Sequence, residues 1–332
     1  MPPAAAIPVL AVVVAVRHGG TTMNRSAARN QLSICMEPTK EETDFIEAQF
    51  ARFNQEATDG RFDCLGEGKS GLAFDLAVKD RDGEIAGGVS VSSVLGVMWL
   101  EVLYVADEFR RRGLASWLVL EAERTAYEKG CVGAGTWTFN WQGPEFYPTI
   151  GYELRGIYTG YPFGVTEHVL AKRLPDEKSV AKTADRIARL RREGFTLLAA
   201  PSQDDMRVVG RGFHQFCMRN AGEEMDTPGI AVRLALKDPA GRVVGGLDAF
   251  TTIRNMVLEA IWIDERFRGQ GYGRRLLVEA ERIAKEAGCS AVSAHGLSFQ
   301  SPGFFHRLGY TTYGVVDVAV DGYTEDLLIK RL

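Results

Sequence analysis

The chain contains one sequence pattern twice, and this repeat restricts the possible folds more than any other feature. Residues 110–115 are Arg-Arg-Arg-Gly-Leu-Ala, and residues 268–273, 158 positions later, are Arg-Gly-Gln-Gly-Tyr-Gly. We therefore predict two copies of one fold. The same offset aligns Gly87 with Gly245, Leu100-Glu101 with Leu258-Glu259, Cys131 with Cys289, and Lys172-Arg173-Leu174 with Lys330-Arg331-Leu332.

The repeat also sets the expected domain boundaries. Upstream of residue 54 the offset is 163, so one loop between about residues 54 and 83 differs in length between the copies, as loops tolerate. We predict domains at residues 33–174 and 195–332, each of a usual domain size, joined by a solvated, charged helical linker at residues 175–194. The pairs at the larger offset are Pro38 with Pro201, Phe50 with Phe213, and Phe53 with Phe216.

The composition indicates a soluble globular protein, with 45% hydrophobic and 25% charged residues. A net charge of −4 argues against general affinity for nucleic-acid phosphates, and interspersed acidic residues make the linker a poor nucleic-acid-binding helix. The five cysteines are an odd number with no metal-ligand spacing. We expect no metal, no nucleic-acid or membrane partner, and a reducing, cytoplasmic location.

The first residues form an apolar run, 4–16, with no Lys or Arg before it. The run is too short for a membrane-spanning helix, and it lacks the positive segment that precedes a secretory signal core. We expect residues 1–32 to be a disordered extension, or the true start to be Met23 or Met36.

Hydrophobic periodicity predicts the elements of one repeat. Along each repeat, apolar residues occur first at helical spacing and then at alternating positions, and a predicted strand then runs into the glycine-rich loop. This order indicates an α/β fold with a mixed, mostly antiparallel sheet flanked by helices. In the first repeat we expect a helix at 39–53, a hairpin at 71–78 and 84–91, a strand at 97–105, a helix at 116–129, another strand, a short helix at 144–149, and a last strand ending near Leu174.

Each glycine-rich loop lies between a predicted strand and a predicted helix. The pattern Arg-x-x-Gly-x-Gly/Ala leaves backbone N–H groups free at a helix N-terminus, where the helix dipole favours an anion. We interpret residues 110–116 as a first pyrophosphate cradle and residues 268–274 as a second. A Walker loop would end in Gly-Lys-Ser/Thr, and a dinucleotide loop would be Gly-x-Gly-x-x-Gly early in a βαβ unit; neither pattern fits.

Each repeat resembles an N-acetyltransferase domain of the GNAT superfamily. The resemblance rests on the Leu-Glu pair before the cradle, a Gly-Tyr pair, a final Lys-Arg-Leu, and the segment after the cradle. That segment is Trp-Gln-Gly-Pro-Glu-Phe-Tyr at 141–147 and Phe-Gln-Ser-Pro-Gly-Phe-Phe at 299–305. An ordered set found twice is far more specific than one glycine loop. It implies two tandem GNAT-like domains packed as a pseudo-dimer.

The resemblance implies acetyl-CoA as co-substrate. The cradle amides would hold its pyrophosphate, and the edge of the preceding strand would pair with the pantetheine arm. The implied binding residues are Val105, Arg110, Arg111, Arg112, Gly113, Ala115 and Ser116 in the first repeat, and Ile263, Arg268, Gly269, Gln270, Gly271, Gly273 and Arg274 in the second.

Acetylation of an amine requires a base, because an alkyl ammonium with a pKa near 10.4 must lose a proton before its nitrogen can attack a thioester. Glu101 and Glu259 lie four residues before Val105 and Ile263, so each is expected on the same strand face as that residue, placed to accept the proton. The alternative is a carboxylate that only orders its neighbours. By resemblance, a backbone N–H near Val105 or Ile263 stabilises the oxyanion.

One position distinguishes the repeats. By resemblance, a tyrosine protonates the departing CoA thiolate; the first repeat has Tyr147 there, and the second has Phe305, which cannot donate. The adjacent His306 points away from that position on a short helix. We therefore assign turnover to the first repeat and expect both repeats to bind acetyl-CoA. The alternative for Tyr147 is a packed aromatic ring with a satisfied hydroxyl.

The leading hypothesis is acetyl transfer to a primary amine of a small molecule, an antibiotic or a metabolite, by direct attack on the thioester. Acidic residues of the first helix would attract a cationic acceptor, or form an ordinary solvated face. A protein amine acetyltransferase and a non-catalytic acyl-CoA sensor stay open, as do a monomer with an internal pseudo-dimer and a homodimer. The acidic residues are Glu41, Glu42, Asp44 and Glu47.

Overall fold

The computed structural model describes residues 32–60, 72–221, 229–300 and 302–332; the expectations for residues 1–31 lie outside these ranges. The first repeat and the linker supply β1 (Ser33–Cys35), α1 (Lys40–Ala57), β2 (Ala73–Lys79), β3 (Ile85–Val94), β4 (Val97–Val105), η2 (Asp107–Phe109), α2 (Leu114–Glu128), β5 (Gly133–Phe139), η3 (Pro144–Ile150), β6 (Glu153–Tyr158), β7 (Glu167–Arg173) and α3 (Glu177–Arg192).

The second repeat has the same order of strands and long helices, and it has additional short helices after its cradle. It supplies β8 (Thr196–Leu198), α4 (Gln203–Ala221), β9 (Ala231–Lys237), β10 (Val243–Thr252), β11 (Asn255–Ile263), η5 (Glu265–Phe267), α5 (Tyr272–Glu286), β12 (Ala291–Leu297), η6 (Ser298–Gln300), α6 (Gly303–His306), β13 (Thr311–Val316), η7 (Val320–Gly322) and β14 (Glu325–Arg331).

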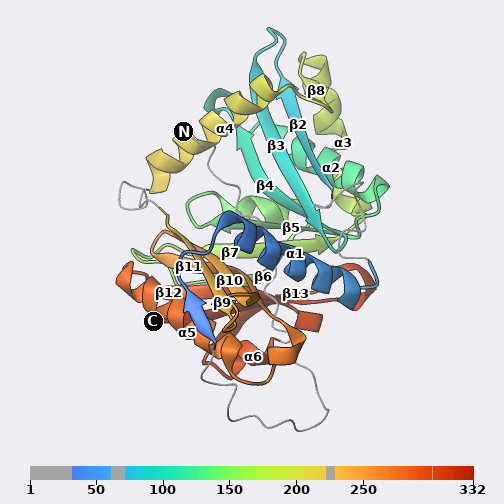
Figure 1. Ribbon diagram of the computed structural model, residues 1–332. Helices are drawn as coiled ribbons and strands as arrows, with labels where there is room; N and C mark the ends of the chain where they lie inside the picture. Colours follow the sequence, from blue (N-terminus) through green and yellow to red (C-terminus); the bar gives the residue numbers. More distant parts are fainter. Residues whose placement is uncertain (1–31, 61–71, 222–228, 301) are drawn as a thin grey trace.

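The α/β prediction with a mixed sheet is confirmed, and within the described residues fourteen strands join into one sheet (Figure 1). We call the unit built on β2–β7 the first half and the unit built on β9–β14 the second half. They meet where β6 pairs with β13 at Gly156 and Gly314. A Cβ at Gly314 would lie 2.5 Å from the carbonyl oxygen of Arg155, so this close approach requires glycine.

The sequence predicted one strand too few after each cradle. It expected one strand after η3, whereas the structure has β6 and β7 there, and β13 and β14 in the second repeat. β6 is short and contains Gly156, which weakens the local strand pattern, and its pairing with β13 comes from the other repeat. The extra strand is therefore set by tertiary contact.

The two repeats exchange their first strand and helix. β1 pairs with β9 of the second repeat, and β8 pairs with β2 of the first. Correspondingly, α1 packs on β9, β10 and β11, while α4 packs on β2, β3 and β4, as Figure 1 shows for the blue and yellow helices. Packing thus groups residues 33–57 with the second half and residues 196–221 with the first half, which the repeat boundaries did not indicate.

The exchange obeys the two sequence offsets. Ser33 pairs with Lys237, and its repeat mate Thr196 pairs with Lys79, the mate of Lys237. The ion pairs repeat as well: Glu42 lies 2.6 Å from Lys237, and Asp205 lies 3.0 Å from Lys79. The exchanged helices therefore occupy equivalent places in the two halves.

In each half, one face of the sheet is covered by that half's own long helix. In the second half, the apolar stripe of α5 packs Leu276 and Leu277 against Ile261 of β11. In the first half, Trp117 and Leu118 of α2 form the equivalent core. None of the described helices combines the length and apolar character that crossing a bilayer requires.

Candidate active site

The second cradle is an open loop at the N-terminus of α5. Gly269 and Gly271 have φ of 72° and 87°, values that favour glycine, and a Cβ at either would meet nothing within 4 Å. The N-cap residue Gly271 has no side chain to cap the helix start, so no N–H group of the first turn is satisfied by an N-cap side chain. This is the arrangement that binds an anion at a helix N-terminus.

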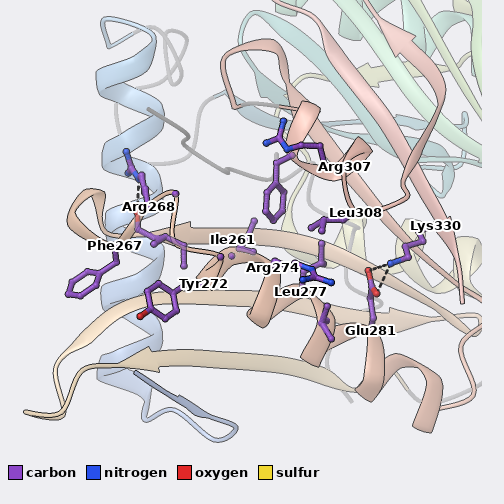
Figure 2. Close-up of a pocket in the computed structure, with 16 residues that line it drawn as sticks. Ile261, Phe267, Arg268, Tyr272, Arg274, Leu277, Glu281, Arg307, Leu308 and Lys330 are labelled. Atoms are coloured by element: carbon purple, nitrogen blue, oxygen red, sulfur yellow. Dashed lines mark hydrogen bonds and ion pairs between the residues drawn. The ribbon is translucent and has the colours of Figure 1, made fainter. Parts of the chain in front are cut away.

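Arg268 fixes the shape of the second cradle. Its Nε donates to the carbonyl oxygen of Ile263 at 2.8 Å, and its guanidinium lies 5.5 Å from the ring of Phe53 on α1. Figure 2 shows Arg268 beside the blue helix α1. Arg268, predicted as a cofactor ligand, thus also joins the cradle to the helix supplied by the other repeat.

A cavity of about 580 Å³ opens at the second cradle (Figure 2). The cations on its wall suit an anionic ligand; Lys330 is paired with Glu281 at 2.7 Å, whereas Arg274 and Arg307 are exposed. Of the residues predicted in the second repeat, Ile263, Arg268, Gly269, Gly271, Gly273 and Arg274 line it. The other lining residues are Ile261, Phe267, Tyr272, Leu277, Val278, Glu281, Phe304, Arg307, Leu308 and Lys330.

Glu259 lies at a β-bulge beside a gap in the sheet. Asp248 pairs with Ala260, and the next residue of β10 pairs with Leu258, so Glu259 is the extra residue of β11. The parallel ladder between β11 and β12 ends at Leu258 and Ala294, immediately before Glu259. The two strands are no longer paired from this point.

The bulge corrects the predicted strand face of Glu259. Ile261 and Ile263 pack in the core beneath α5, whereas Ala260 contacts Phe50 of α1 on the other face. A spacing of four residues implies a shared face only in a regular strand, and the bulge adds one residue. The same bulge occurs in β4 at Glu101, so the prediction was wrong for both glutamates.

The surroundings of Glu259 raise its pKa to about 7. Burial is the largest cause, the negative charges of Asp248 and Glu47 act in the same direction, and Arg233 opposes them. Glu47 belongs to α1, so the first repeat contributes charge to the second half's site. A carboxyl group with this pKa is partly ionised at neutral pH, as a general base requires.

Glu101 occupies the equivalent place in the first half with different neighbours. Its Oε1 accepts a hydrogen bond from the hydroxyl of Ser92. Burial raises the pKa of Glu101, and the Ser92 hydrogen bond opposes that shift. Asp248 is replaced here by Ser90, so the first half lacks the second carboxylate of the pair.

The first cradle has the same backbone shape but a different environment. Gly113 has φ of 104°, and Arg110 donates to the carbonyl oxygen of Val105 at 3.0 Å, as Arg268 does to Ile263. However, α3 lies over this loop: the Cδ of Arg186 is 2.1 Å from the place of a Cβ on Gly113. A linker side chain therefore fills space that is open in the second cradle.

Further contacts hold α3 in this place. The guanidinium of Arg112 lies 2.6 Å from the carboxylate of Glu193, and Arg189 donates to the carbonyl oxygen of Arg112 at 3.4 Å. Leu190 is fully buried. α3 lies in the predicted helical linker and most of its residues are exposed, as expected, but Ile187 and Leu190 pack against the first half's core.

The structure buries Tyr147 in the first half's core. Its side chain packs edge-on against Tyr152 with ring centroids 5.6 Å apart, and Phe305 makes the same contact with Tyr310 in the second half at 5.2 Å. Burial raises the pKa of the Tyr147 hydroxyl, and Thr136 opposes the shift by a hydrogen bond. The geometry thus supports the packed-aromatic alternative for this residue.

Phe50 and Phe53 were not predicted as site residues from the sequence, whereas Glu47 was predicted as part of an acidic face that attracts the acceptor. All three reach the second half only through the exchange of α1, and nothing in the linear pattern indicated that exchange. Arg307 replaces Thr149 of the first repeat, a difference visible at the offset of 158. Among the described residues, no group of His, Cys, Asp and Glu side chains is arranged to hold a metal ion.

The chain belongs to the GNAT acetyltransferase family. The family model described as "Acetyltransferase (GNAT) family" matches residues 38–152 and 187–310, more than half of the chain, so the predicted resemblance and the enzyme class are confirmed. Each match contains one cradle and one bulge glutamate. The protein is an acyltransferase of a family that uses acetyl-CoA.

Individual relatives are named as acetyltransferases. Blasticidin-S acetyltransferase of Streptomyces morookaense is 39% identical over 97 residues, which are 28% of this chain and 68% of that protein. A putative acetyltransferase of Bacillus subtilis is 38% identical over 74 residues, 22% of this chain and 49% of that protein. The crystal structure of an acetyltransferase from Bacillus cereus covers 41% of this chain and 96% of its own, with 31% identity and a TM-score of 0.39.

Proposed function

We propose that the second half binds acetyl-CoA and transfers its acetyl group to a primary amine of a small cationic molecule. The observation that carries the proposal is the contrast between the cradles: the second lines a cavity of about 580 Å³, whereas in the first the Arg186 side chain of α3 lies against Gly113. This assignment replaces the one based on Tyr147, which placed turnover in the first repeat.

The residues around the second cradle fit the anionic part of acetyl-CoA. The N–H groups that open α5 would hold the pyrophosphate, with Arg274 and Arg307 as further cations. The bound thioester supplies the activated acyl group. In the first repeat the positions of both arginines carry Ser116 and Thr149, which supply no charge.

Glu259 is the proposed general base. It would take the proton of the attacking ammonium directly or through water, and its pKa of about 7 suits this task at neutral pH. A backbone N–H near Ile263 would donate to the oxyanion of the tetrahedral intermediate. General base catalysis of this kind contributes about 10²–10⁴-fold in rate.

The second half does not need the tyrosine that it lacks. A thiol has a pKa of about 8.5, so a thiolate is a good leaving group that water can protonate after it departs. Phe305 is therefore compatible with turnover. A general acid would accelerate the step without being required for it.

The negative charges around Glu259 favour a cationic acceptor. Asp248 and Glu47 act on Glu259 with negative charge, and such a region attracts an ammonium group. The name of the relative from Streptomyces morookaense supports an antibiotic amine as one acceptor. We propose a monomer with an internal pseudo-dimer, acting in the cytoplasm on a small molecule and without a metal.

The test is acetyl-CoA consumption with a panel of amines that includes blasticidin S and a lysine peptide. We expect turnover with a small amine, lowered about 10²–10⁴-fold by Glu259→Gln and unchanged by the matched variant Glu101→Gln. Loss of turnover in Glu101→Gln alone would return the reaction to the first half. Turnover with the peptide alone would favour a protein acetyltransferase, and binding without turnover would favour a sensor.

A further inference from the structure

The helix supplied by the first repeat makes a buried polar contact inside the second half's site. Asn54 is on α1, one turn beyond Phe50, which packs against Ala260 in the strand of Glu259. Its side chain is fully buried. Fully buried amides are costly unless their hydrogen bonds are made, so the partners of Asn54 define its role.

Asn54 is joined to the end of β12 through one glutamine. Gln300 Nε2 donates to Asn54 Oδ1 at 2.8 Å, and Gln300 Oε1 accepts from the N–H of Leu297, the last residue of β12, at 2.9 Å. Gln300 is also fully buried. The chain Asn54–Gln300–Leu297 therefore ties α1 to the carboxyl end of β12.

This end of β12 forms one side of the gap beside Glu259. The ladder between β11 and β12 stops at Leu258 and Ala294, so beyond that pair no backbone hydrogen bond between these strands sets their separation. α1 packs on β11, and Asn54 reaches β12 through Gln300. The width of the gap thus depends on a contact made by a helix of the other repeat.

The equivalent hydrogen bond in the first half is weaker. Cys217 on α4 is the repeat mate of Asn54, and Gln142 donates to its thiol at 3.7 Å. Gln142 accepts from the N–H of Phe139 at 2.8 Å, as Gln300 does from Leu297. A thiol is a poor acceptor, so the amide at residue 54 gives the stronger tie, in the half whose cradle is open.

We propose that Asn54 is a positioning residue of the first repeat for acyl transfer in the second half. Through Gln300 it fixes the end of β12, and hence the gap beside Glu259. Asn54 Nδ2 has no partner among the described residues, so its two hydrogens are not committed to the fold. The proposal rests on the proposed function of the second half.

Kinetics of the full chain test this role, with Cys217→Ala as the matched control. Asn54→Ala and Asn54→Leu should lower kcat about tenfold or more, because a small misplacement at the reaction centre has a large effect on rate. The KM for acetyl-CoA should stay within about twofold, because the cradle is unchanged. Asn54→Gln, which keeps the amide, should recover part of kcat, and Cys217→Ala should keep the wild-type rate.

Hydrogen exchange of the same variants tests the tie without catalysis. In Asn54→Ala the amides of residues 295–300 should exchange faster than in the wild type, while those of 137–142 stay unchanged. Unchanged exchange, or a fall in thermal stability with an unchanged kcat, would overturn the proposal. A wild type that turns over no amine would contradict only the proposed function, because hydrogen exchange would still show whether Asn54 stabilises the end of β12.

Discussion

The side chain of Arg186 on α3 lies directly against Gly113 of the first cradle. Its Cδ is 2.1 Å from the position of a Cβ on Gly113, and the same position on Gly271 in the second cradle has no atom within 4 Å. Two loops with nearly the same backbone therefore differ in what surrounds them. The linker, which has no counterpart inside either repeat, produces the difference.

Alanine substitutions at the equivalent glycines Gly113 and Gly271 should have different effects because the surroundings of the two cradles differ. Both glycines have positive φ, so Gly113→Ala and Gly271→Ala should each lose about 1–2 kcal/mol of stability from backbone strain. Gly113→Ala must also displace Arg186, so its melting temperature should be the lower of the two. Only Gly271→Ala should weaken acetyl-CoA binding, by about tenfold, because only Gly271 lines the cavity.

Isothermal titration calorimetry tests how many molecules of acetyl-CoA one chain binds. Titration of the wild type with acetyl-CoA should give one site per chain, and Gly113→Ala should keep it. Two equivalent sites, or a lower affinity in Gly113→Ala than in Gly271→Ala, would contradict the view that α3 closes the first cradle.

The pH dependence of turnover should report Glu259. The base must be ionised, so kcat/KM should rise with pH and level off above the pKa of Glu259, about 7. In Glu259→Gln the rise should continue toward the pKa of the acceptor amine, near 10.4 for an alkyl amine. Initial rates from pH 5.5 to 9.5 provide the test, and an identical profile in the two proteins would remove Glu259 as the base.

Ionisation of Glu259 should also make the stability of the folded protein depend on pH. The pKa of Glu259 is higher in the folded chain, about 7, than its usual value of 4.5, so folding favours the protonated form. Its contribution to stability is present below pH 4.5 and is lost as the pH rises to about 7. Relative to the wild type, Glu259→Gln should therefore be more stable at pH 8 than at pH 4.5, measured by denaturant unfolding at both values.

Tyr147→Phe should leave turnover within about twofold of the wild type. The hydroxyl of Tyr147 is buried in the first half's core, and the second half carries phenylalanine at the equivalent place. Steady-state rates with the preferred amine test this. A fall of tenfold or more at unchanged stability would assign the acid, and with it the reaction, to the first half.

The repeat made most of the internal fold of each half predictable from the sequence, although β6 and β13 were missed. Strand 97–105 was predicted with the observed ends, and the helices at α1, α2 and α3 were placed within a few residues, because each has a regular apolar period. The cradles and bulge glutamates were found because their residue types repeat at one offset. The bulge itself was not predicted, since an extra residue in a strand leaves no periodic signal.

The exchange and the closed first cradle could not be predicted from local pattern. α1 would fit on either half of the sheet because the two halves are homologous. The half on which it packs depends on chain geometry and tertiary packing. Arg186 is one of many charged residues in α3, and it reaches Gly113 because Leu190, one helical turn further along α3, is buried in the first half's core. These contacts, and not the local sequence pattern, make the surroundings of the two cradles different.

Gly246 and Ile46 give a direct test of the exchange. A Cβ on Gly246 in β10 would lie 2.3 Å from Cδ1 of Ile46 on α1, so Gly246→Ala should destabilise the protein by about 1–3 kcal/mol through overpacking. Ile46→Val removes Cδ1 and should relieve part of that cost. The double variant should therefore be more stable than the sum of the single effects implies, by at least about 0.5 kcal/mol.

The control for this cycle is the equivalent glycine of the first half. A Cβ on Gly88 would meet Cγ2 of Val209 on α4 at 2.5 Å and not Ile46, so Gly88→Ala combined with Ile46→Val should show additive effects. Urea unfolding of the wild type, the three single variants and the two double variants supplies the free energies. Coupling of Ile46 to Gly88 instead of Gly246 would mean that α1 packs on its own repeat's sheet, and the contribution of Glu47, Phe53 and Asn54 to the second half would then be lost.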